Sequence, residues 1–172
     1  MGDFMKKLLL ITAILVMLLS FLCSCSKKEE PHKELSKAID INALLEDMTK
    51  AAGDLPDMTT FSSKDEDAQS TFNFLCDLNY EKVDSFLITY ASEATSEEIF
   101  IIHLKDANDI PIAKSSLENR IKARRTAFNT YLPTEVAKID NAQITSYGNY
   151  IALIICPTTQ STVDAFQQFF TK

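Results

Sequence analysis

Glycine and histidine are scarce in this sequence, since its 172 residues include only three glycines and two histidines. A loop that cradles a phosphate group needs several closely spaced glycines, so no such loop is expected. The histidines are His32 and His103, and no cluster of cysteines and histidines has the spacing of a zinc site. We therefore expect no cofactor apart from a covalent lipid, which is argued below.

Long apolar runs are also missing, with one short exception near the N-terminus. Residues 8–22 are apolar apart from Thr12 and Ser20, and two lysines precede them. A permanent transmembrane helix needs about 20 apolar residues, and this run is shorter. A basic segment, a short apolar segment and then small residues are typical of a secretory signal peptide. We expect residues 1–24 to form that signal peptide, with an uncleaved anchor as the alternative.

The end of this run has a distinctive pattern, Leu22-Cys23-Ser24-Cys25. It resembles the lipobox of bacterial lipoproteins, in which a leucine, a tolerant position and a small residue precede an obligatory cysteine. The resemblance implies cleavage after Ser24 and covalent diacylglycerol on the thiol of Cys25. Cys23 is the poorer candidate because it follows the bulky Leu22. The predicted lipidation site is Cys25, and the predicted location is the outer face of the cytoplasmic membrane.

The chain has no excess of basic residues, because 17 Lys and Arg stand against 24 Asp and Glu, for a formal net charge of -7. An acidic surface is a poor partner for nucleic acid. Residues 25–37 are charged and poor in apolar side chains, which predicts a flexible, lipid-anchored tether. The expected partners are the membrane, through the lipid anchor, and an unidentified envelope protein or ligand.

Two further cysteines, Cys76 and Cys156, lie in the remainder of the chain. An exported pair of cysteines can form a disulfide. Both nevertheless lie in apolar segments, where free cysteines are commonly buried as thiols. Sequence spacing does not decide between these alternatives, and both stay open at this point.

Apolar periodicity predicts a single domain of alternating helices and strands over residues 38–172. Three helices are expected: one capped by Asp40, one over 112–132, and one that begins at the capping-box pattern Ser161-Thr162-Val163-Asp164. Residues 68–78 mix apolar and polar side chains, and a short helix is preferred there. Two hairpins are expected, 86–91 with 99–104 and 143–147 with 150–156, the second around Gly148-Asn149. Residues 57–67 are polar and are expected to form a loop.

This order predicts an α+β fold. We expect an antiparallel sheet of two hairpins with helices packed on one face, in the order α-ββ-α-ββ-α. About 130 residues are enough to bury an adequate core without disulfides.

Short motifs along the chain add a family resemblance. They are Leu55-Pro56-Asp57-Met58, the stretch 78–86, Glu98-Ile99-Phe100-Ile101-Ile102, Arg120, the stretch 128–135, and Gly148-Asn149-Tyr150-Ile151-Ala152-Leu153. In this order the motifs resemble the short bacterial lipoproteins of Gram-positive type that carry domain of unknown function 4358. Cys76 departs from the pattern, where an aromatic residue such as tyrosine is expected. The family implies a location at the membrane and no established activity.

Catalytic groups are few. His103 is the only histidine of the domain, and it shares a strand face with Ile99 and Ile101, where a structural histidine is the ordinary outcome. Glu97 and Glu98 lie in the polar segment that is predicted to link the two strands of the first hairpin, so they are expected to be solvated. The alternate acids Asp65 and Asp67 weakly resemble a calcium loop, but Ser70 stands where that loop needs glycine. No catalytic residue and no metal ligand is predicted.

Two arginines of the long helix stand out. At 100° per residue, Arg124 falls within the apolar stripe, and Arg120 lies at its margin. Arg124 could lay its methylene groups over the core and reach water with its charged end. Alternatively, Arg124 and Arg120 could contact an anionic ligand or form a buried ion pair.

These observations favour a membrane-anchored extracytoplasmic lipoprotein that acts as a non-catalytic binding or interaction module at the cell envelope. Two alternatives remain. One is an envelope hydrolase that uses paired carboxylates, with one of the pKa values raised. The other is an accessory subunit of a transport or secretion complex.

Overall fold

The structure, a computed structural model, describes residues 38–171. The predicted signal peptide, the lipidation site Cys25 and the tether lie outside these residues. In the described part, no helix combines the length and the apolar character that a membrane crossing requires.

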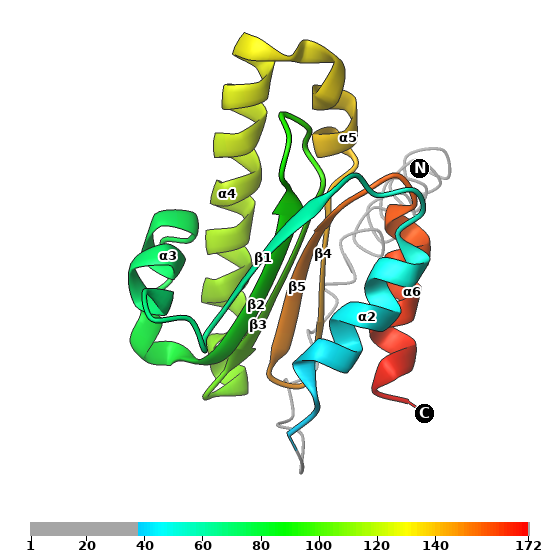
Figure 1. Ribbon diagram of the computed structural model, residues 1–172. Helices are drawn as coiled ribbons and strands as arrows, with labels where there is room; N and C mark the ends of the chain where they lie inside the picture. Colours follow the sequence, from blue (N-terminus) through cyan, green and yellow to red (C-terminus); the bar gives the residue numbers. More distant parts are fainter. Residues whose placement is uncertain (1–37, 172) are drawn as a thin grey trace, which may run out of the picture. The chain divides into compact units, whose positions relative to one another are not determined.

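Five antiparallel strands form one sheet (Figure 1). In chain order they are β1 (Met58–Ser62), β2 (Val83–Ala91), β3 (Glu98–Leu104), β4 (Gln143–Tyr147) and β5 (Tyr150–Ile155). In space the order is β1-β2-β3-β5-β4, so β3 is the middle strand, with β2 and β5 on either side of it. The two predicted hairpins, β2–β3 and β4–β5, are confirmed and pair with each other through β3 and β5.

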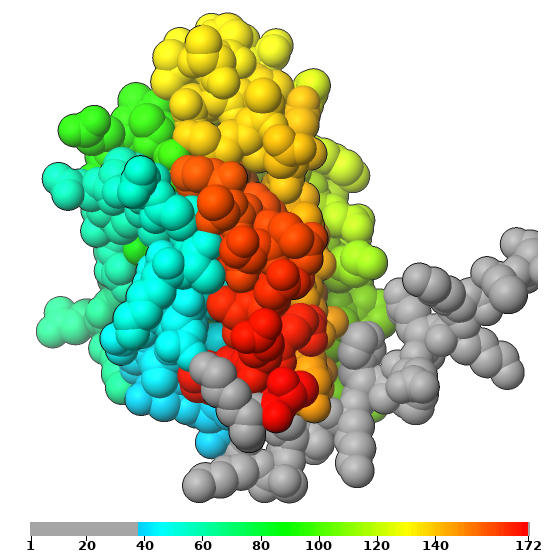
Figure 2. All heavy atoms as spheres, turned by 90° about the vertical axis from the view of Figure 1, so that its right-hand side faces the viewer, coloured from blue at the N-terminus to red at the C-terminus, as the bar shows by residue number. Residues whose placement is uncertain are grey.

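Helices cover both faces of this sheet (Figure 1). They are α2 (Ile41–Ala51), α3 (Ala68–Leu75), α4 (Ile110–Tyr131), α5 (Val136–Asp140) and α6 (Thr159–Phe169). Three short 3₁₀ turns are described as well: η1 (Tyr80–Lys82) precedes β2, η2 (Ala107–Asp109) precedes α4, and η3 (Pro133–Glu135) lies between α4 and α5. Helices α3 and α4 cover one face, and α2 and α6 lie side by side on the other (Figure 2).

The α+β class and the antiparallel sheet are confirmed, but the prediction of helices on one face is corrected. Alternate residues of β3 enter two separate cores: Phe100 and Ile102 pack beneath α4, whereas Ile99 and Ile101 pack beneath α2 and α6. Every residue of β5 is buried. A continuous apolar run of this kind is typical of a strand that is covered on both sides.

Residues 57–67, predicted as a loop, contain the edge strand β1. Thr59 and Thr60 give the segment little apolar character, which hid the strand, but β-branched side chains suit a pleated edge. The hydroxyl of Thr60 donates to that of Thr89 on β2 (3.1 Å), and the ring of Phe61 stacks on that of Tyr90. A hydroxyl pair and a stacked pair of rings therefore join this strand to β2.

The N-terminal cap of α2 and the turn between β4 and β5 are as predicted. The Asp40 side chain accepts a hydrogen bond from the backbone N–H of Asn42 and caps α2, and Gly53 follows the helix with φ of +80°. Gly148 makes the β4–β5 turn with φ of +56°. The capping box at Ser161 is wrong: α6 begins at Thr159, so Ser161 lies inside the helix.

Cys76 and Cys156 are free and buried, which settles the disulfide question. Cys76 belongs to the core beneath α3 and α4, and Cys156 to the core beneath α2 and α6. The sheet lies between them, because their side chains enter cores on opposite faces.

Candidate functional site

The core-facing stripe of α4 is apolar at its two ends and charged in its middle. Ala113 and Leu117 are buried near the start and Phe128 near the end. Arg120 and Arg124 occupy the positions between them, where the side chains are 11% and 19% exposed. Spacings of three and four residues place all five on one side of the helix.

Both arginines point at Glu98, the first residue of β3. Arg120 donates from Nε to Oε1 (2.5 Å) and from Nη2 to Oε2 (2.7 Å), a two-point pairing of guanidinium and carboxylate. Arg124 Nε lies 3.3 Å from Oε2 of the same carboxylate. The Glu98 side chain is completely buried, so its prediction as a solvated residue is wrong. The neighbouring Phe100, on the same sheet face, shows why: Glu98 continues the core-facing alternation of β3.

A second charged group lies beside the first. Glu97 and Glu135 both accept hydrogen bonds from Lys138 Nζ. Glu135 also accepts from the backbone N–H and the hydroxyl of Ser96 (2.9 and 2.8 Å), while Arg124 donates to the Ser96 carbonyl (3.0 Å). Glu97 is 5% exposed and was also predicted to be solvated, which is a second correction. This network fastens the β2–β3 loop to α4 and α5.

The pKa values of Glu97 and Glu135 lie below their ordinary range. Burial acts to raise the pKa of each carboxyl, but hydrogen bonds, those from Lys138 foremost, outweigh it. A carboxyl group that donates a proton in catalysis needs the opposite shift, a raised pKa. In this network the two carboxylates are held ionised by a cation.

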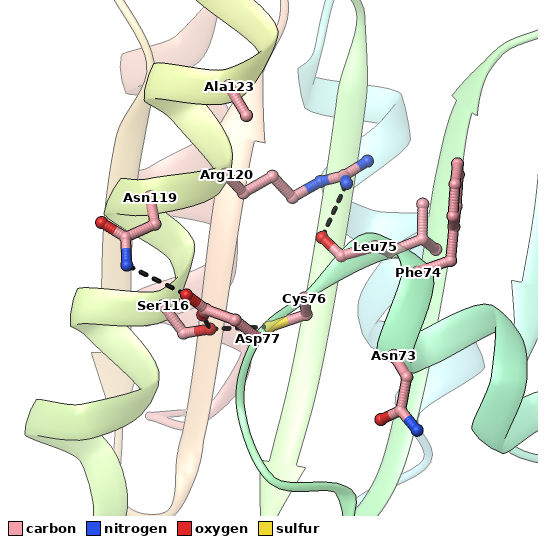
Figure 3. A pocket seen from close by; sticks show the side chains of 9 residues that line it. All are labelled: Asn73, Phe74, Leu75, Cys76, Asp77, Ser116, Asn119, Arg120 and Ala123. Atoms are coloured by element: carbon pink, nitrogen blue, oxygen red, sulfur yellow. Dashed lines mark hydrogen bonds between the residues drawn. The ribbon is translucent and has the colours of Figure 1, made fainter.

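A hollow of about 240 Å³ opens beside the network, between the C-terminal end of α3 and the middle of α4 (Figure 3). Arg120 forms part of its wall and donates from Nη1 to the Leu75 carbonyl (2.8 Å). That carbonyl belongs to the last residue of α3, where a cationic donor is favourable. Arg120 therefore joins three elements: α4, β3 and the end of α3.

Asp77 is the carboxylate of this hollow (Figure 3). It accepts hydrogen bonds from the hydroxyl of Ser116 and from the side-chain amide of Asn119 (3.0 Å), both on α4. The hydrogen bond from Ser116 lowers the pKa of Asp77, and the one from Asn119 acts in the same direction. The carboxylate is ionised near neutral pH and is held by two uncharged donors.

Cys76 lines the floor of the hollow, with its Sγ 3.2 Å from Ser116 Oγ. Burial raises the pKa of the Cys76 thiol, so the thiolate is disfavoured. A nucleophilic cysteine needs the opposite shift, a lowered pKa.

Phe74 stands at the rim of the hollow and is 89% exposed. Its neighbours on α3, Phe72 and Leu75, turn toward the core beneath α4, whereas the Phe74 ring is left in solvent. The mixed apolar and polar pattern of residues 68–78 gave no sign of which phenylalanine would be outside.

His103 lies at the other end of β3 and does not join the hollow. Its Nδ1 is 2.9 Å from Asp84 Oδ2, its Nε2 is 2.9 Å from Asn149 Nδ2, and its ring stacks on Tyr150 at 4.1 Å. Burial lowers the pKa of His103 and outweighs Asp84, which acts in the opposite direction. Both ring nitrogens are engaged, which is the arrangement of a structural histidine.

The acids that weakly resemble a calcium loop serve the backbone and a neighbouring hydroxyl. Asp65 accepts a hydrogen bond from the N–H of Ser62 (2.7 Å), and Asp67 accepts one from the hydroxyl of Thr71 (3.2 Å). Within residues 38–171, no group of three or more His, Cys, Asp and Glu side chains could hold a metal ion.

Comparison with known proteins gives one match. The family described as Domain of unknown function (DUF4358) matches residues 51–156, which include β1 to β5, α3, α4 and the hollow between these two helices. No curated protein and no solved structure matches the chain. Because the match spans more than half of the 172 residues, this chain belongs to the DUF4358 family.

Proposed function

We propose that this protein is a lipid-anchored extracytoplasmic module that binds a partner protein at the hollow between α3 and α4 and does no chemistry there. The anchor part of the proposal rests on the sequence, in which Cys25 ends a lipobox pattern behind a signal-peptide-like segment. An accessory subunit of a transport or secretion complex would be one form of such a module.

The observation that carries the binding part is Phe74, a residue that is 89% exposed beside a hollow. Removing a phenylalanine side chain from water is favourable by about 1.5–3 kcal/mol. Aromatic residues, phenylalanine among them, are enriched at the cores of protein interfaces. The hollow next to Phe74 offers the partner a shaped surface with both apolar and polar walls.

The environments of the titratable groups support binding without catalysis. Burial disfavours the Cys76 thiolate, and the two ring nitrogens of His103 are engaged by Asp84 and Asn149. Paired carboxylates for hydrolysis would need one raised pKa, whereas those of Glu97 and Glu135 are lowered.

The binding site can be tested by photo-cross-linking in cells of the natural host. The full chain would carry p-benzoylphenylalanine in place of Phe74. A control chain would carry it in place of Ile112, which is 51% exposed near the start of α4 and outside the hollow. A defined protein adduct at position 74 and its absence at position 112 are expected. Equal labelling at both positions, or no adduct at position 74, would overturn the proposal.

The anchor can be tested separately by metabolic labelling with an alkyne fatty acid. The full chain is expected to incorporate the label, and the Cys25→Ala chain is expected to remain unlabelled and unprocessed. Unchanged labelling of Cys25→Ala would refute the lipidation site without affecting the binding test.

A further inference from the structure

We propose that the hollow between α3 and α4 receives the cationic end of an arginine or lysine side chain from the partner protein, which pairs with Asp77 and packs against Phe74. This inference rests on the proposed function of the hollow as a binding site. It adds the chemistry of the group that enters the hollow.

The charge balance of the hollow points to a cation. Asp77 lies on its wall, and its two hydrogen-bond donors, Ser116 and Asn119, are uncharged. No ion pair of Asp77 is found among residues 38–171. Asp77 is exposed to solvent, so its carboxylate is oriented by neutral donors and has no counterion within the part of the chain that the structure describes.

The one cation on the wall does not fill that role. Arg120 gives two of its N–H groups to the buried Glu98 carboxylate and a third to the Leu75 carbonyl (Figure 3). Swinging toward Asp77 would leave Glu98, whose side chain is completely buried, with weaker pairing, which is costly. Arg120 therefore stays in the wall of the hollow, and its charge is neutralised by the Glu98 carboxylate of β3.

The size of the hollow favours a side chain over a larger ligand. Sites for drug-sized molecules and cofactors usually enclose about 300–1,000 Å³, and this one holds about 240 Å³. Arginine and lysine combine an apolar stem with a charged end. The Phe74 ring can pack against such a stem, or lie beneath the cation and attract it through its π face, while Asp77 accepts hydrogen bonds from the charged end.

The test is an NMR titration of the full chain in detergent micelles, which follows the side-chain amide signals of Asn119. The probes are the capped peptide Gly-Arg-Gly and its isostere with citrulline, which has the same shape without the charge. We expect saturable shifts of the Asn119 signals with the arginine peptide that weaken as salt is added, and shifts at least tenfold smaller with the citrulline peptide.

Variants of the full chain locate the contact. Asp77→Asn, which removes the charge and keeps one acceptor, is expected to weaken binding of the arginine peptide at least tenfold. Phe74→Leu, a change at a position that is 89% exposed, is expected to weaken it severalfold. Glu118→Gln, which removes a charge from the exposed surface of α4 outside the hollow, is the matched control and should leave binding unchanged.

Three outcomes would overturn the inference: equal shifts with arginine and citrulline peptides, larger shifts with Gly-Glu-Gly or Gly-Leu-Gly, or equal loss of binding in Asp77→Asn and Glu118→Gln. If cross-linking at position 74 succeeds while the arginine peptide fails, the hollow binds a partner but takes a different group. If both fail, the proposed function itself is wrong.

Discussion

Glu98 and Arg120 form a two-point ion pair across the interface between β3 and α4, with the carboxylate completely buried and oxygen–nitrogen distances of 2.5 and 2.7 Å. The guanidinium of Arg120 also lies 5.9 Å from the centre of the Phe100 ring, and that of Arg124 lies 5.2 Å from the centre of the Phe128 ring. The charged middle of α4 is thus packed among aromatic rings as well as paired.

Glu98→Gln is the first predicted destabilising change. It keeps the size of the side chain but leaves Arg120 and Arg124 without their buried counterion, and breaking such a pair costs about 3–5 kcal/mol. Urea unfolding of the full chain measures this loss in the free energy of unfolding. The surface change Glu118→Gln should stay within about 0.5 kcal/mol of the parent, and a similarly small effect of Glu98→Gln would contradict the structural role of the pair.

Acid should weaken the attachment of the β2–β3 loop. Folding lowers the pKa values of Glu97 and Glu135 below the ordinary 4.5, so their contribution to stability is complete above that pH and is lost as the pH falls through the lowered values. Unfolding free energies measured between pH 7 and pH 3 should therefore decline at the acid end. Lys138→Met removes the hydrogen bonds that lower both pKa values, so the decline should be shallower in this variant; an unchanged slope would argue against the network.

The free energy of unfolding should also depend on pH through His103, at a higher pH than through Glu97 and Glu135. The pKa of His103 is lowered below the ordinary 6.5, so its contribution is complete above 6.5 and declines as the pH falls toward the folded pKa. The Asn149 amide donates to both the Leu104 carbonyl and His103 Nε2, which leaves the ring proton on Nδ1, next to Asp84. Nitrogen-15 NMR should show this tautomer near neutral pH and protonation below pH 6.5; a pKa above 6.5 would contradict the arrangement.

The two positive-φ glycines should respond differently to alanine. An L-residue in this conformation costs about 1–2 kcal/mol, which sets the expected loss for Gly148→Ala. Gly53→Ala should lose more, because its added Cβ would lie 3.3 Å from both Cγ2 and Oγ1 of Thr158. Paired urea unfolding curves of the two variants test the order, which would be wrong if Gly148→Ala were the more damaging change.

The free cysteines should react only when the protein unfolds. Cys76 and Cys156 are 4% and 2% exposed. Iodoacetamide labelling followed by peptide mass spectrometry should show little modification of either residue in the native chain and full modification in urea. Finding the two peptides joined by a disulfide would contradict their placement in separate cores.

Much of the fold could be predicted because its signals are local. The cap at Asp40 depends on one neighbouring N–H, and the β4–β5 turn depends on the backbone freedom of Gly148. The edge strand β1 was missed because its partners lie on β2, nearly 30 residues away, as in the Thr60–Thr89 pair. Nothing within residues 57–67 signals that pairing.

The candidate site was only partly predictable for the same reason. Helical periodicity singled out Arg120 and Arg124. Their counterion Glu98 was predicted to belong to a solvated link, whereas it is the first residue of β3. The exposure of Phe74 depends on how α3 packs against the rest of the domain. The short separation of Phe74 and Asp77 in the sequence does not show that both side chains line one hollow. A periodic pattern identifies a face, whereas a site requires the faces of several elements to meet.

The backbone N–H of Ile39 donates to the hydroxyl of Tyr150 (3.3 Å), and the ring of Tyr150 is buried against His103. The short segment before α2 is thereby attached to β5, an inner strand with neighbours on both sides. A mechanical pull from the N-terminal side would reach this contact before it reached α2. The force that this hydrogen bond transmits would fall on β5, which pairs with β3 on one side and β4 on the other.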